Sequence, residues 1–94
     1  MPKYSIKTSH RFEQDVRRCM KRGLPMEELW KVIGLLLETG MLPPQYKQHK
    51  LSGNRAGQWE CHIKPDWLLV WEQNDLELHL LFLYTGTHSD LFKK

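Results

Sequence analysis

The sequence has little of what marks membrane, secreted or cysteine-ligated metal proteins. Its only cysteines, Cys19 and Cys61, stand far apart and form no Cys-x-x-Cys pair. No apolar run approaches the roughly 18 residues that span a bilayer, and residues 1–7 lack the apolar stretch of a signal peptide. We therefore expect a cytoplasmic protein with two reduced, buried thiols and no membrane contact.

Repeats, low-complexity tracts and linkers are also missing, and 94 residues suffice for one domain. We predict a single domain over residues 1–94 with a modest core. The net charge of +3 is uneven, because residues 1–50 carry ten basic and five acidic side chains, whereas residues 51–94 carry four and six. Such an excess is compatible with RNA or an acidic protein as partner, but is also common in proteins that bind neither.

The first half of the chain predicts a strand and two helices. Residues 4–8 alternate in the manner of a short strand. Residues 12–20 and 26–37 place apolar side chains at helical spacing, and Gly23 and Gly40 suit the positions that end these helices. Because only about two residues join them, we expect an antiparallel helical hairpin.

The second half changes to a period of two residues. Residues 58–64 alternate, residues 67–72 form a nearly continuous apolar strand, residues 73–75 a turn and residues 76–84 a long strand. These strands make an antiparallel meander, with a small extra strand at 47–51. The predicted order is β-α-α-β-β-β, an α+β fold whose N-terminal helical hairpin covers one face of a small antiparallel sheet and leaves the other partly open.

Acid–base and basic side chains gather near the expected strand ends. Histidine has an unperturbed pKa of about 6.5 and exchanges protons near neutral pH. RNA cleavage without a metal needs a base for the ribose 2′-hydroxyl, an acid for the leaving 5′-oxygen and a donor that stabilises the phosphate. Candidates for proton transfer are His49, His62, Asp66 and His88, for phosphate contacts Lys50, Arg55 and Lys64, and for base stacking Trp67, Tyr84 and Phe92.

Each candidate also has a purely structural interpretation. His62 lies on the polar face of its strand and His88 in a loop, so both suit a solvated surface. Asp66 after Pro65 suits a turn cap, and Trp67 suits the core. The proton-transfer candidates also include zinc-ligand types, but tight ligand spacing is missing from the sequence. We therefore expect no metal and no other cofactor.

Three segments of the second half form a specific combination, although each is weak alone. They read Tyr-Lys-Gln-His-Lys-Leu at 46–51, Cys-His-Ile-Lys-Pro-Asp-Trp at 61–67 and Thr-Gly-Thr-His-Ser-Asp-Leu-Phe at 85–92. Together they resemble the YafQ toxins, which belong to the RelE superfamily of bacterial type II toxin–antitoxin systems. The resemblance covers nearly the whole chain and implies a RelE-like fold.

The resemblance also implies an activity and partners. Such proteins are metal-independent mRNA interferases that cut messenger RNA in the ribosomal A site and leave a 2′,3′-cyclic phosphate. An antitoxin of the DinJ kind wraps the toxin, and operator DNA is bound only through the antitoxin. The family's functional residues fall on His49, His62, Asp66, Trp67, His88 and Phe92. The resemblance implies His88 as principal acid or base, Asp66 and His62 as general base or its orienting partner, and His49 as phosphate contact or proton-transfer partner.

One position departs from the family pattern. Arginine usually stands directly before Thr-Gly-Thr-His, and this chain has Tyr84. A phenol lacks the charged fork of a guanidinium, and loss of one transition-state donor lowers rates by about 10²–10³. Arg55 or Lys64 can supply the missing cation. The sequence favours a ribosome-dependent endoribonuclease toxin and leaves open two alternatives, a weak or inactive module that binds antitoxin and ribosome without cutting, and an α+β domain of unrelated function.

Overall fold

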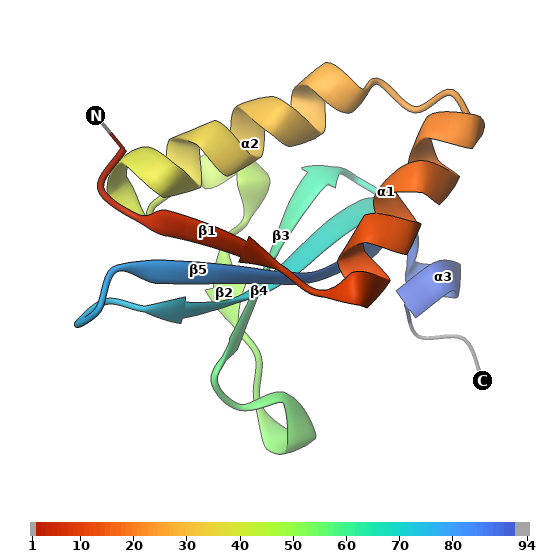
Figure 1. The fold of residues 1–94 in the computed structure, drawn as a ribbon. Coiled ribbons are helices and arrows are strands. Elements are labelled where there is room, and N and C mark those ends of the chain that lie inside the picture. Colours follow the sequence, from red (N-terminus) through yellow and green to blue (C-terminus); the bar gives the residue numbers. More distant parts are fainter. Residues whose placement is uncertain (1, 92–94) are drawn as a thin grey trace.

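The computed structural model describes residues 2–91, which contain three α-helices and a five-stranded sheet (Figure 1). In chain order the elements are β1 (Ser5–Thr8), α1 (His10–Lys21), α2 (Met26–Thr39), the 3-10 turn η1 (Pro44–Tyr46), β2 (His49–Lys50), the 3-10 turn η2 (Gly53–Arg55), β3 (Gln58–Lys64), β4 (Trp67–Asn74), β5 (His79–Gly86) and α3 (His88–Leu91). The predicted α+β class and the order β-α-α-β-β-β are confirmed, with the short strand β2 where one was expected. Among the described residues, no helix is long and apolar enough to cross a membrane.

The sheet is mixed, not purely antiparallel as expected. Its strand order is β1-β5-β4-β3-β2, and β3, β4 and β5 form the predicted antiparallel meander. β1 lies parallel to β5, with Ser5 opposite His79. A short hairpin forces its two strands to be antiparallel, but β1 and β5 are joined by most of the chain, so no turn sets their direction.

The two long helices begin and end at the residues that their local chemistry favours. The Ser9 hydroxyl accepts the Phe12 N–H at 2.9 Å and caps α1. Gly23 and Gly40 follow the helices with φ of 75° and 74°, a left-handed conformation that glycine adopts at little cost. This preference for glycine directly after a helix is why the sequence predicted both helix ends correctly.

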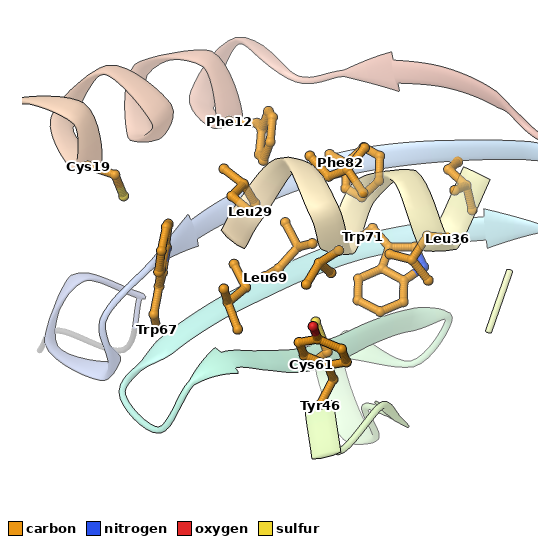
Figure 2. Packing of buried hydrophobic residues seen from close by; sticks show 14 of the residues in the cluster. Phe12, Cys19, Leu29, Leu36, Tyr46, Cys61, Trp67, Leu69, Trp71 and Phe82 are labelled. Atoms are coloured by element: carbon orange, nitrogen blue, oxygen red, sulfur yellow. The ribbon is translucent and has the colours of Figure 1, made fainter. Parts of the chain in front are cut away.

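Both helices and one face of the sheet share a single hydrophobic core (Figure 2). In α1 the ring of Phe12 lies 5.6 Å from that of Phe82 in β5, centroid to centroid. Leu29 and Leu36 of α2 and Trp71 of β4 are fully buried in the same cluster. Burial of each such side chain contributes about 1.5–3 kcal/mol, so the helical layer stabilises the sheet that carries the opposite face.

β5 begins at His79, not at residue 76 as the leucine alternation predicted. Residues 75–78 form a turn in which the Asn74 side-chain oxygen accepts the N–H groups of Leu76 and Glu77 at 3.0 and 2.8 Å. Leu76 is 97% exposed. An asparagine that bonds the following backbone competes with strand pairing, and here it prevails over the apolar pattern.

The opposite face of the sheet carries a smaller apolar cluster and the short helix α3. Leu91 of α3 packs with Leu68 and Val70 of β4. The helix starts with a reciprocal cap: the Thr87 N–H donates to the Asp90 carboxylate at 3.0 Å, and the Asp90 N–H donates to the Thr87 hydroxyl at 3.1 Å. Arg22 at the end of α1 donates to the same carboxylate at 2.6 Å. The segment that contains His88 is therefore held at both ends.

Candidate functional site

Three histidines form a row on the face of the sheet opposite α1 and α2. The ring centroids of His49 and His62 lie 6.4 Å apart, and those of His62 and His88 lie 6.0 Å apart. The antiparallel register places Glu60 opposite His49, and His62 follows Glu60 by two residues on the same face. The fold thus brings together residues of β2, β3 and α3 that the sequence predicted for proton transfer.

Asp66, in the turn between β3 and β4, completes the row at its His88 end. Its Oδ1 lies 2.6 Å from His88 Nδ1 and accepts the His88 backbone N–H at 3.1 Å. These hydrogen bonds hold the pKa of the Asp66 carboxyl below its ordinary value. An ionised carboxylate only accepts hydrogen bonds, so His88 Nδ1 is the donor in this pair.

Glu60 is a member of the site that the search for acid–base residues missed. Its Oε1 lies 3.2 Å from His49 Nε2, and its side chain is largely buried. The other ring nitrogen of His49 lies 2.8 Å from the Lys47 carbonyl oxygen. A signal for Glu60 was present in the sequence, since it occupies the polar face of β3 two residues before His62.

Tyr84 lies on the same face, two strands away from Glu60. Tyr84 pairs with Val70, and Val70 pairs with Glu60, which is a separation of about 10 Å at the usual strand spacing. Arg55 of η2 donates a hydrogen bond to the Tyr84 hydroxyl, and its guanidinium lies 5.3 Å from the ring centroid. The guanidinium of Arg11 in α1 lies 5.0 Å from the same ring. Two cations are thus held against this tyrosine.

The residues before His88 are anchored in the interior. The Thr85 N–H donates to buried Asp15 of α1 at 3.2 Å, and the Thr85 hydroxyl donates to the Leu68 carbonyl at 2.6 Å. Asp15 in turn pairs with Arg18 at 2.9 Å. The buried carboxylate and the buried hydroxyl are therefore both satisfied, and they fix the backbone from which His88 extends.

Two of the sequence-predicted RNA contacts lie elsewhere. Trp67 was expected to stack on a base, but its side chain is 3% exposed and its indole N–H donates to Thr85 at 3.0 Å within the core (Figure 2). Lys50 was expected to contact phosphate, but its ammonium lies 5.3 Å from the Trp59 ring. Because neighbouring residues of a strand point to opposite faces, Lys50 points away from the face of His49. The structure thus places Trp67 in the core, the alternative that the sequence had left open, and Lys50 beside Trp59.

The remaining predicted contacts divide between the site and its border. Arg55 lies against Tyr84 as described, and Lys64 lines a cleft together with His62. Phe92, the third stacking candidate, lies outside the described residues. Within residues 2–91, no group of three or more His, Cys, Asp or Glu side chains is placed to hold a metal ion.

Comparison with known proteins agrees with this architecture. A family model described as bacterial toxin of type II toxin–antitoxin system, YafQ, matches residues 4–93. The mRNA interferase toxin YafQ of Escherichia coli strain K12 is 36% identical over 88 residues, which cover 93% of this chain and 94% of that protein. The crystal structure of YafQ from E. coli strain BL21(DE3) has a TM-score of 0.88 at 34% identity, covering 95% of this chain and 98% of that one.

A toxin–antitoxin complex is among the similar structures. A chain in the E. coli DinJ–YafQ complex has a TM-score of 0.87 to this protein at 35% identity, and the match covers 96% of this chain and 98% of that one. Fold, site and comparisons define the class as the toxins of bacterial type II toxin–antitoxin systems, and within that class the chain belongs to the YafQ family.

Proposed function

We propose that this protein is an mRNA interferase, a metal-independent endoribonuclease that inhibits translation by cutting messenger RNA in the ribosomal A site. The observation that carries the proposal is the hydrogen bond from His88 to ionised Asp66, at the end of a row of histidines about 6 Å apart. The E. coli relative is an mRNA interferase toxin, which supports the proposal.

The proposed partners follow from the similarity to the E. coli relative. The E. coli relative forms a complex with DinJ, and we propose a DinJ-like antitoxin that wraps this toxin. Operator DNA is then bound only through the antitoxin. The uneven charge, with its basic excess in residues 1–50, suits association with the ribosome and messenger RNA.

In the proposed reaction His88 is the general base and His62 the general acid. Nε2 of His88 takes the proton of the ribose 2′-hydroxyl, whose oxygen attacks the adjacent phosphorus. The bond from phosphorus to the 5′-oxygen breaks, and His62 protonates that oxygen. The products are a 2′,3′-cyclic phosphate and a 5′-hydroxyl. Asp66 positions His88, as a carboxylate positions histidine in other acid–base sites, and His49, held by Glu60, contacts the phosphate.

The phosphate also needs a cation beyond the histidines. We assign this role to Arg55, which lies against Tyr84 at the position where the resemblance expects arginine. Lys64 is the second cation, beside His62. Phe92 and the exposed part of Tyr84 are the proposed base-stacking groups, and Trp67 supports the Thr85 segment from the core.

Induced expression tests the proposal with His88→Ala and a matched control, His10→Ala, at an exposed histidine whose ring Nε2 lies 3.2 Å from the side-chain nitrogen of its helix neighbour Gln14. Wild type and His10→Ala arrest growth and cut a translated message, mapped by primer extension, whereas His88→Ala loses cleavage by about 10²-fold or more. If wild type and His88→Ala cut equally, the catalytic assignment is wrong.

A second candidate function rests on Tyr84. With arginine absent from this position, the protein can act as a toxin-fold module that engages antitoxin and ribosome without cutting. That function predicts tight binding of antitoxin and ribosome by wild type, and no cleavage product from either wild type or His88→Ala in the same primer-extension experiment.

A further inference from the structure

A cleft beside His62 extends the site toward the helical layer. It has a volume of about 430 Å³ and lies between α2, the end of η1 and the end of β3, within the size range of small-ligand sites. His62 belongs both to this cleft and to the histidine row. An RNA strand that passes along the histidine row can therefore continue directly into the cleft.

Three lysines give the cleft its chemical character. Lys31 of α2, Lys47 after η1 and Lys64 at the end of β3 all line it, against a single carboxylate, Glu28. All three lysines are exposed. An ammonium group is a compact, strongly hydrated charge that suits phosphate, so the cleft fits an anion and not an apolar ligand.

The backbone explains why the cleft exists at this place. β2 pairs with β3 only at Trp59 and Glu60, so residues 62–64 border the cleft as a strand edge without a strand partner on that side among the described residues. Pairing stops because Lys47 has a left-handed backbone, with φ of 53°, and its N–H closes η1 on the Pro44 carbonyl at 3.0 Å. The turn that opens the strand edge thus also places a lysine in the cleft.

We propose that Lys31, Lys47 and Lys64, here called the lysine cleft, bind a backbone phosphate of single-stranded RNA adjacent to the phosphate that is cut. The inference rests on the proposed function, because it names the substrate path next to the same histidines. The recognised group is a phosphodiester in an extended strand. Sequence is not read in the cleft, since the lysines contact only the backbone.

The test measures binding of a short 2′-O-methyl RNA, which lacks the attacking hydroxyl, by fluorescence anisotropy over a series of salt concentrations. The variant is Lys31→Gln/Lys47→Gln. The matched control, Lys7→Gln/Lys21→Gln, removes the same charge from β1 and the end of α1, where both lysines are exposed. Each single-strand phosphate contact contributes about 0.7 to the slope of log K against log salt.

The expected result is specific to the cleft. The cleft variant loses about 0.7 in the magnitude of the slope, the share of one phosphate contact, and binds roughly tenfold more weakly at low salt. The control keeps the wild-type slope within about 0.3. Lys31→Glu, a single charge reversal on the exposed side of α2, weakens binding in the same direction, and a thermal unfolding curve shows that all variants are folded.

Three results overturn the proposal. The first is equal RNA binding by the cleft variant and the control, and the second is no RNA binding by wild type. The third is a cleft variant that loses affinity only for the antitoxin, which makes the cleft a protein interface. Failure of the proposed function is a separate result: wild type then yields no cleavage product, while the salt dependence of the cleft variant on 2′-O-methyl RNA is still altered.

Discussion

Tyr84 and Arg55 form a pair on the face of the sheet that carries the histidines. Tyr84 takes a position where the family resemblance expects arginine, and its hydroxyl accepts a hydrogen bond from Arg55. Arg55, the half-buried last residue of η2, has its guanidinium 5.3 Å from the centroid of the Tyr84 ring. A desolvated guanidinium–aromatic contact is worth up to about 2 kcal/mol, enough to keep the arginine near the face that carries the histidines.

The first prediction concerns this pair. Arg55→Gln lowers the rate of cleavage of a translated message by about 10²-fold, because one donor to the transition state is lost. Tyr84→Arg in the Arg55→Gln background restores most of the rate, since it returns a guanidinium to the same face. Single-turnover cleavage rates check both steps, with Arg17→Gln on the exposed surface of α1 as the control for charge. A double variant no faster than Arg55→Gln would show that Arg55 acts elsewhere.

At the scale of elements, α3 is a four-residue helix that depends on its cap and on α1. Asp90 joins the two, since it accepts hydrogen bonds from Thr87 and from Arg22. The Arg22 guanidinium, with help from Thr87, holds the pKa of the Asp90 carboxyl far below its ordinary value, although desolvation opposes this shift. The folded state therefore favours the ionised form of Asp90.

The second prediction follows from this pKa. Because the folded-state pKa is below the unfolded value of about 3.9, Asp90 stabilises the fold at pH above that value, and the contribution is lost as pH falls toward the folded-state pKa. Asp90→Asn lowers the free energy of unfolding at pH 7 by about 1–3 kcal/mol. Urea unfolding at pH 7 and at pH 3 checks the sign, because the difference from wild type shrinks at the lower pH.

Two observations sharpen the test of Asp90. Glu77→Gln, at an exposed carboxylate in the turn before β5, is the control and leaves the free energy of unfolding nearly unchanged at both pH values. Asp90→Asn also slows RNA cleavage, because α3 carries His88. A pH-independent difference between wild type and Asp90→Asn would mean that shape, not charge, holds α3.

Elements also show where sequence reasoning succeeds and where it stops. The helix ends were predictable because a hydroxyl cap and two glycines act within a few residues. The predicted start of β5 was wrong because the Asn74 side chain bonds the backbone of the next residues into a turn, although the leucines there alternate as in a strand. The parallel pairing of β1 was beyond reach, because it depends on contacts between distant parts of the chain.

For the molecule as a whole, the pairing register of the strands determines which side chains meet at the site. Three histidines separated by 13 and 26 residues in the chain meet because β2, β3 and α3 end on one face. Their residue types were visible in the sequence, but their partners were not: Glu60 reads as one more polar position on β3, and Trp67 at the start of its strand suits both the core and base stacking. Alternation assigns a face to a residue, and only the packed sheet shows which faces are covered.

The third prediction tests that packing globally through the two thiols. Cys19 and Cys61 are fully buried in the shared core, and burial raises the pKa of Cys61 to about 12. A thiolate is then both scarce and inaccessible, so the folded protein at pH 8 reacts with a disulfide reagent only when the core opens. Two equivalents react at once in denaturant, and in the folded protein labelling is slower by about 10³-fold or more. Ser52→Cys, in an exposed loop, is the matched control and reacts immediately in the folded state. Rapid labelling of native wild type would mean that the helical layer does not keep the reagent out of the core. The core would then be too loosely packed to support the sheet face on which the histidine row lies.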